Sequence, residues 1–322
     1  MAVIKATNTV MCCVVVVFAS ATSCSRDRGS SWVLMDGAGS SDTVWESEAK
    51  LDTPGGDSTT TATSNGSIRT RGESCKKIDF LFAIDNSGSM KSIQQKLIMS
   101  FEPFIDAIVT NVDAQDYHVM VVDSDGGGQG CEHALGAGQV RHCEVPNPPR
   151  FLTSAAQVPR IRSAFECVAN VGTMGSSLEM TFTAVEEAVT THNASHGCNP
   201  GFLRHDAVLV VVIITDDHAG WFGEDNAQNV GTPRQWYETI LAAKAYVPSH
   251  VVVLGFIPTR NGPDDCLDRW RDGDSDRFVE FMQLWGDQGI TASVCEPDFG
   301  PFFQQAVELI DATCDAYVAP VE

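Results

Sequence analysis

The chain is poor in basic side chains. Its 322 residues include 21 Lys and Arg against 42 Asp and Glu, for a formal net charge of -21. Clustered Lys and Arg bind a phosphate backbone, and no such cluster is visible in the sequence. The shortage of basic residues therefore argues against nucleic acid as a partner, and equally against attraction to a membrane through a polybasic patch.

The apolar segment near the N-terminus is too short to span a bilayer. It runs over Val10–Ala19, the length of the apolar region of a secretory signal peptide. The letters "ATSC" follow, and their Ser23 and Cys24 resemble the end of a bacterial lipoprotein signal, with Ala21 where that signal prefers a branched apolar residue. We therefore expect a signal peptide over residues 1–23 and a lipid anchor on Cys24 that tethers the protein to a membrane, with cleavage by an ordinary signal peptidase as the alternative.

The residues after Cys24 suggest a location and a spacer. Ser25 replaces the Asp that retains such lipoproteins at an inner membrane, so we expect an outer-membrane or cell-surface protein, or a periplasmic or secreted one without the anchor.

Between residues 25 and 74, 25 of the 50 residues are Ser, Thr, Gly or Pro. We therefore expect a flexible linker over 24–74 and a folded domain over 75–320.

Cysteine usage supports export independently. Of the 11 cysteines, two lie in the apolar segment and Cys24 is the anchor candidate, which leaves eight: Cys75, Cys131, Cys143, Cys167, Cys198, Cys266, Cys295 and Cys314. An even number in an exported chain indicates disulfides, although eight cysteines allow 105 pairings and the sequence alone does not select one. By position we expect Cys131 with Cys143, Cys167 with Cys198, Cys266 with Cys295, and Cys75 with Cys314.

Strand and helix patterns alternate along the domain. Apolar runs predict strands near residues 77–85, 117–125, 207–214, 250–258 and 289–295. Helical spacing predicts helices near 93–108, 155–169, 177–191, 234–245, 276–285 and 301–317, with Pro103 kinking or splitting the first. This alternation predicts an α/β protein with a Rossmann-like, doubly wound, mostly parallel sheet covered by helices on both faces.

Oxygen-bearing side chains follow two of the predicted strands. In "IDFLFAIDNSGSM", Asp85 ends the first strand, and Ser87 and Ser89 follow on alternate positions. Asp216 ends the most apolar strand, and Thr173 lies between two glycines just before a helix. Ligands of such folds gather at the carboxyl ends of the strands, so we expect these five residues to converge. Hard oxygen donors in this number suit Mg2+, Mn2+ or Ca2+.

The same five residues resemble a known family. "DNSGSM" is similar to the DxSxS signature of von Willebrand factor type A domains, and Thr173 and Asp216 fall where that family has its remaining metal ligands. The resemblance spans roughly residues 77–317. It implies a six-stranded sheet in the order 3-2-1-4-5-6 and a metal-ion-dependent adhesion site.

The resemblance also implies how such a site works. Ser87, Ser89 and Thr173 would hold the cation directly, and Asp85 and Asp216 mostly through water. A partner protein would complete the coordination with an Asp or Glu carboxylate. Because the domain carries 34 acidic and 15 basic residues, we expect a partner surface that is neutral or basic around that carboxylate.

Alternatives remain for the conspicuous residues. Asp85, Ser87 and Ser89 could form an ordinary turn and helix cap, or a site that keeps its residues and binds no partner. A second cluster could hold zinc, although in an exported protein a disulfide explains it better; it comprises Cys131, His133, His142 and Cys143.

His218 and Trp221 follow Asp216 closely and are expected to form a rim that a partner touches. His218 could instead act as the base of a metal-dependent hydrolase, but the hydroxyls of Ser87 and Ser89 are already assigned to the metal. We therefore expect a binding protein rather than an enzyme. A structural envelope component, in which the cation only stabilises the fold, is the main alternative.

Overall fold

The structure is a computed structural model, and it describes residues 75–112, 114–126, 130–139, 150–154, 158–176, 178–217, 229–259 and 277–320. The expected signal peptide, the lipidation site at Cys24 and the linker lie outside these residues. Among the described residues, no helix is both long enough and apolar enough to cross a membrane.

The core of the domain is a six-stranded sheet in the order β3-β2-β1-β4-β5-β6. All neighbouring strands pair in parallel except β2 and β3 at one edge, which are antiparallel. This confirms the predicted fold class and strand order. The strands are β1 (Lys77–Ile84), β2 (Asp116–Asp123), β3 (Leu152–Thr153), β4 (Val208–Ile214), β5 (Val251–Ile257) and β6 (Gly289–Ser293).

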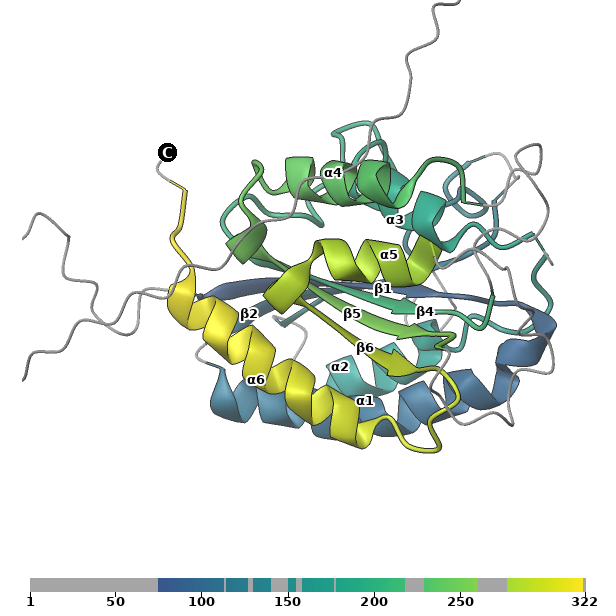
Figure 1. Cartoon of the computed structure of the whole chain (residues 1–322), viewed down its shortest axis with the longest axis horizontal. Coiled ribbons are helices and arrows are strands. Elements are labelled where there is room, and N and C mark those ends of the chain that lie inside the picture. Colours follow the sequence, from purple (N-terminus) through teal and green to yellow (C-terminus); the bar gives the residue numbers. More distant parts are fainter. Residues whose placement is uncertain are drawn as a thin grey trace, which may run out of the picture. The chain divides into compact units, whose positions relative to one another are not determined.

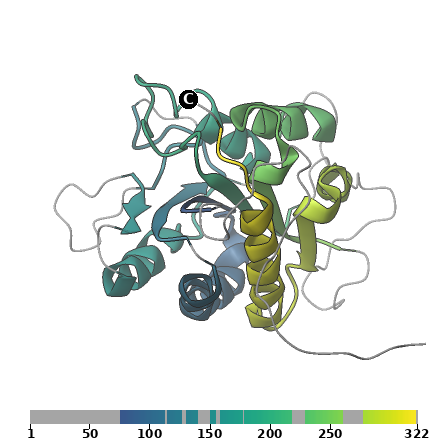
Figure 2. The same cartoon turned by 90° about the vertical axis from the view of Figure 1, so that its left-hand side faces the viewer.

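Helices cover both faces of the sheet, as Figures 1 and 2 show. Along β1, Phe80 and Phe82 pack toward α1, α2 and α6, whereas Leu81 and Ala83 pack toward α3, α4 and α5. Side chains of a strand alternate between faces, so an unbroken apolar run such as that of β4 is needed where both faces are covered. The helices are α1 (Lys91–Asn111), α2 (Val158–Ala169), α3 (Thr181–Val189), α4 (Pro233–Ala243), α5 (Arg277–Leu284) and α6 (Gly300–Ala316).

Two helix predictions differ from the structure. Of the two outcomes expected at Pro103, the split does not occur, because the apolar face of α1 is buried along its whole length. The helix α3 begins at Thr181 rather than near residue 177, because the side chain of Asn229 accepts a hydrogen bond from the backbone N–H of Phe182 at 2.7 Å and so caps the start of the helix. As a result Leu178 precedes the helix and is 43% exposed.

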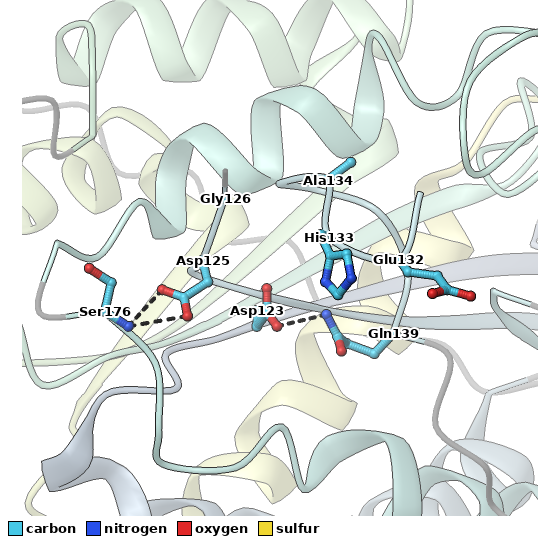
Figure 3. A pocket seen from close by; sticks show the side chains of 8 residues that line it. All are labelled: Asp123, Asp125, Gly126, Glu132, His133, Ala134, Gln139 and Ser176. Carbon is cyan, nitrogen blue, oxygen red and sulfur yellow. Dashed lines mark hydrogen bonds between the residues drawn. The ribbon is translucent and has the colours of Figure 1, made fainter. Parts of the chain in front are cut away.

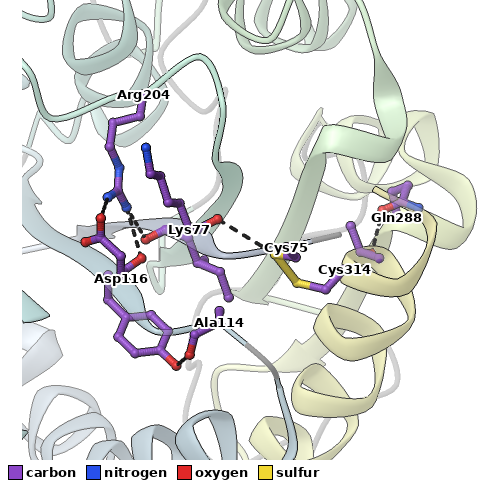
Figure 4. The surroundings of a disulfide bond; sticks show 10 residues. Cys75, Lys77, Ala114, Asp116, Arg204, Gln288 and Cys314 are labelled. Carbon is purple, nitrogen blue, oxygen red and sulfur yellow. Dashed lines mark hydrogen bonds and ion pairs between the residues drawn. A yellow bond between two sulfur atoms is a disulfide. The ribbon is translucent and has the colours of Figure 1, made fainter. Parts of the chain in front are cut away.

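Disulfides join distant segments of the domain. Cys75, just before β1, is bonded to Cys314 near the end of α6, as expected (Figure 4). Cys131 is bonded to Cys198, so the expected pairs of Cys131 with Cys143 and of Cys167 with Cys198 are wrong. The disulfide of Cys131 also excludes its thiolate as a zinc ligand.

Contacts between loops account for the Cys131–Cys198 pair. The side chain of Asn199 donates to the carbonyl oxygen of Gly136 at 2.8 Å, which holds the loop after β2 against the loop after α3. Cys167 and Cys295 are also disulfide-bonded, while Cys143 and Cys266 lie outside the described residues. Several disulfides in one domain indicate an oxidising compartment and hence an exported protein.

A buried ion pair lies at the edge of the sheet where the strands begin. Asp79 is fully buried and accepts hydrogen bonds from the backbone N–H of Arg204 at 2.7 Å and from its Nε at 2.8 Å. The guanidinium of Arg204 also pairs with Asp116 at 2.7 Å (Figure 4). The ammonium of Lys244 donates to the carbonyl oxygen of Arg204 at 2.6 Å. This network lies where the parallel strands begin, at the end of the sheet opposite to Asp85.

Candidate functional site at the carboxyl ends of the strands

The loop after β1 carries the first three of the predicted site residues. Asp85 is fully buried, and its Oδ1 accepts a hydrogen bond from the backbone N–H of Ser87 at 2.7 Å. The hydroxyl oxygens of Ser87 and Ser89 lie 3.2 Å apart. Ser87 precedes the short 3-10 helix Gly88–Met90 and makes no side-chain capping bond to it. Helix capping therefore does not explain this hydroxyl pair.

Thr173 lies in a loop that is held against the end of β1. The side chain of Gln94, which is buried on α1, donates to the carbonyl oxygen of Asp85 at 3.1 Å and to that of Gly172 at 2.8 Å. One amide group thus joins the residue after β1 to the residue before Thr173. The structure therefore places Thr173 at the same edge as Asp85, as the sequence predicts.

A glycine allows this close approach. The backbone N–H of Gly175 donates to the carbonyl oxygen of Asn86 at 3.0 Å. A Cβ atom at residue 175 would lie 2.2 Å from Oδ1 of Asn86 and 2.7 Å from its carbonyl oxygen, so a larger residue would push the loop away. Gly175 is therefore required for this close packing of the Thr173 loop against the loop after β1.

The end of β4 completes the set. The backbone N–H of Asp85 donates to the carbonyl oxygen of Ile214 at 2.9 Å, and the hydroxyl of Thr215 donates to Oδ2 of Asp85 at 2.8 Å. Asp216 follows directly, close enough for its charge to act on Asp85. The structure thus brings all five predicted residues to one edge of the sheet. The rim residues His218 and Trp221 lie outside the described residues.

The site is electrostatically unfavourable for its own carboxylates. Burial, together with the charge of Asp216, raises the pKa of Asp85 to about 7, although the hydrogen bonds from Ser87 and Thr215 oppose the shift. A divalent cation would reverse this balance, because it would be the largest charge nearby and would favour the ionised carboxylates. Among the described residues, no three His, Cys, Asp or Glu side chains could hold a metal by themselves. The predicted set combines three hydroxyl oxygens with two carboxylates, and a donor set of this kind fits a hard cation.

Sequence reasoning missed residues that support the site. Gln94 and Thr215 position the loops through the bonds described above. Glu179 is 7% exposed, and burial together with the charges of Asp85 and Asp217 raises its pKa to about 10. In the sequence, Gln94 interrupts the apolar face of α1, and a polar residue there could have indicated a buried hydrogen-bonding role. The sequence around Glu179 gives no comparable signal.

An acidic cavity of about 340 Å3 lies beside the site. Its wall includes Asp125, which accepts hydrogen bonds from the side chain of Asn86 at 3.2 Å and from the backbone N–H of Ser176 at 2.9 Å. Asp125 thus connects the cavity to the loops of Ser87 and Thr173. Figure 3 shows the lining residues, which are Asp123, Asp125, Gly126, Glu132, His133, Ala134, Gln139 and Ser176.

Comparison with known proteins assigns this chain to no family. No family model matches the chain, and no curated protein matches it. Similar solved structures include proximal thread matrix protein 1 from the mussel byssus, at 14% identity and a TM-score of 0.39 over 74% of this chain and 49% of that one. The pilus adhesin SpaC from Lactobacillus rhamnosus GG is 12% identical, with a TM-score of 0.40 over 74% of this chain and 30% of that one. The chain thus matches half or less of either protein, and these likenesses carry no argument about function.

Proposed function

We propose that this protein is an exported von Willebrand factor type A domain that binds a protein partner through a divalent cation. The cation would be Mg2+, or Mn2+ or Ca2+, held by Asp85, Ser87, Ser89, Thr173 and Asp216. The observation that carries the proposal is the convergence of three separate loops at the edge where the parallel strands end. Neutral hydroxyls in the set leave the ion electrophilic toward an incoming Asp or Glu carboxylate.

The surroundings of the site favour a particular kind of partner. Asp123 and Glu132 line the neighbouring cavity, and the whole chain is strongly acidic. A partner surface that is neutral or basic around its one carboxylate would meet less repulsion, and salt screens the remaining charges beyond about 8 Å. A lipid anchor on Cys24 would hold the domain at the outer membrane or cell surface.

The test combines cation binding with partner capture. Titration calorimetry with MgCl2 should show one site in the wild type and weak or no binding in Ser87→Ala. The control variant Ser249→Ala changes a half-buried serine just before β5, at the opposite edge of the sheet, and should bind Mg2+ as the wild type does. The mature domain should then capture its partner in Mg2+ and release it in chelator.

The outcome distinguishes the alternatives. Lost partner capture in Ser87→Ala with little change in melting temperature supports adhesion. A large fall in melting temperature, with capture that ignores the metal, supports the structural role of the cation instead. A wild-type domain that binds no divalent cation would refute the proposed site itself.

A further inference from the structure

Three exposed apolar side chains lie on the two segments that border the candidate cation site. Met174 directly follows the proposed ligand Thr173 and is 98% exposed, while Leu178 and Val230 are 43% and 64% exposed. We name these three side chains the apolar rim. Resting on the proposed function, we propose that the apolar rim contacts an aliphatic or aromatic side chain that lies next to the partner's Asp or Glu carboxylate.

The backbone that presents Met174 to solvent is held on both sides. The side chain of Gln94 donates to the carbonyl oxygen of Gly172 at 2.8 Å, two residues before Met174. The backbone N–H of Gly175, directly after Met174, donates to the carbonyl oxygen of Asn86 at 3.0 Å. The contacts that bring the preceding proposed ligand to the site therefore also place Met174 beside it.

Leu178 lies on the continuation of the same segment. Gly175 is bonded to the loop after β1, and the backbone N–H of Met180 donates to the carbonyl oxygen of Ser124, at the end of β2, at 3.0 Å. Leu178 therefore lies at the carboxyl ends of these two neighbouring strands. It precedes α3, which begins at Thr181, and its side chain stays exposed there.

Asn229 joins the segments of Leu178 and Val230. Its side chain donates to the carbonyl oxygen of Glu179 at 3.1 Å and accepts from the backbone N–H of Phe182 at 2.7 Å. Leu178 precedes Glu179, and Val230 follows Asn229. These two members of the apolar rim therefore lie on backbone segments that are bonded to each other.

The gathering of apolar side chains beside the site is informative. Single exposed apolar residues are common on protein surfaces, whereas a group of them indicates a contact surface. In the part of the chain that the structure describes, three of the seven exposed large apolar side chains belong to the apolar rim, and the others are Met99, Val109, Tyr246 and Val318.

The cation site determines what covers the apolar rim. A carboxylate that binds a cation held by Thr173 brings the neighbouring residues of the partner against Met174. An apolar side chain in that place gains free energy by burial, whereas a charged one loses water without compensation. The net charge of -21 opposes an anionic lipid surface, so a protein fits the apolar rim better than a membrane.

The first experiment uses a displayed library of linear peptides that carry a fixed Asp, random residues on both sides and no other acidic residue. The library is selected against the wild-type protein in MgCl2 and again in EDTA. Peptides that bind only in MgCl2 should carry Leu, Ile, Val, Met or an aromatic residue beside the Asp. For the best of them, replacing that apolar residue by Ser should weaken binding about tenfold.

The second experiment tests whether the apolar rim causes this preference. The ratio of the two peptide affinities, apolar over Ser, should fall from about tenfold in the wild type to about threefold or less in Met174→Ser, because the contact needs both partners. This ratio compares two peptides on the same variant, so it does not depend on how the variant binds Mg2+. The matched control is Met99→Ser, which removes a methionine that is 71% exposed on α1 and should keep the wild-type ratio.

The results separate this proposal from the proposed function. A wild-type protein that binds no Mg2+ in calorimetry refutes the cation site and the apolar rim together. If it binds Mg2+ but selects no Mg2+-dependent peptide, or selects peptides with basic or polar residues beside the Asp, only the role of the apolar rim is wrong. An unchanged affinity ratio in Met174→Ser would overturn that role as well.

Other occupants of the apolar rim give results of their own. Sedimentation with phosphatidylethanolamine and phosphatidylglycerol vesicles in EDTA, lost in Met174→Ser, would assign the apolar rim to lipid. A dimer in sedimentation velocity that Met174→Ser dissociates would assign it to a second copy of the chain. Either result would contradict the proposal.

Discussion

The hydroxyl of Thr215 offers the sharpest test of how the site is held together. It is fully buried, donates to Oδ2 of Asp85 at 2.8 Å and accepts from the backbone N–H of Asp217 at 3.0 Å. Thr215→Val keeps the shape of the side chain and removes both hydrogen bonds. A hydrogen bond to a charged group is worth about 1.5 to 3 kcal/mol, and loss of the bond that orients a metal ligand lowers metal affinity about 10- to 100-fold. We therefore expect Mg2+ to bind at least about tenfold more weakly.

The same substitution should lower the free energy of unfolding of the cation-free protein by about 1 to 3 kcal/mol, because a buried N–H loses its partner. Calorimetric titration with MgCl2 and urea unfolding measure the two effects. Thr239→Val is the control, because its hydroxyl also donates to a carboxylate, that of Glu186 at 2.9 Å, between α3 and α4. If Thr215→Val folds and binds Mg2+ within twofold of the wild type, the idea that Thr215 orients Asp85 is wrong.

Two further predictions concern the opposite edge of the sheet. Arg204→Met should lower the free energy of unfolding by about 3 to 5 kcal/mol, because it leaves Asp79 buried without its guanidinium, and Asp79→Asn in the same chain should restore part of the loss. Urea unfolding of the single and double variants checks this, and a double variant less stable than Arg204→Met would contradict it. Burial lowers the pKa of Lys244 from 10.5 to about 8. The unfolded chain therefore holds more protons between pH 8 and 10.5, so the free energy of unfolding should rise with pH across that window, by up to about 3 kcal/mol. Lys244→Met should abolish the rise, and an unchanged pH profile in that variant would show that another group is responsible.

The sheet could be predicted because its pattern is local. The apolar runs of β1 and β4 need no knowledge of the rest of the chain to indicate strands that are covered on both faces. The two-residue strand β3 has no such pattern and forms only because it pairs with His118 and Val119 of β2. The disulfide of Cys131 likewise depends on how two loops meet, which the spacing of cysteines does not encode.

Some residues of the candidate site could likewise be placed from local sequence patterns, and others could not. Asp85, Ser87 and Asp216 could be placed from the ends of two strands, and Thr173 from its glycine-flanked loop and a family resemblance. The supporting contacts could not be placed, since Gln94 reaches Gly172 across 78 residues and Thr215 reaches Asp85 across 130 residues. Contacts of this range are set by the packed fold. Cation binding by the assembled residues stays a prediction.

The bond between Cys75 and Cys314 determines how the domain would carry a mechanical load. It lies where β1 begins, whereas Asp85 lies where β1 ends. If the proposed anchor and partner both hold, a pull between them would run along the strand. The hydrogen bonds of β1 to its parallel neighbours β2 and β4 lie across that direction. They would be loaded together in shear rather than opened one after another. The disulfide would pass part of the same force from the start of β1 directly into α6.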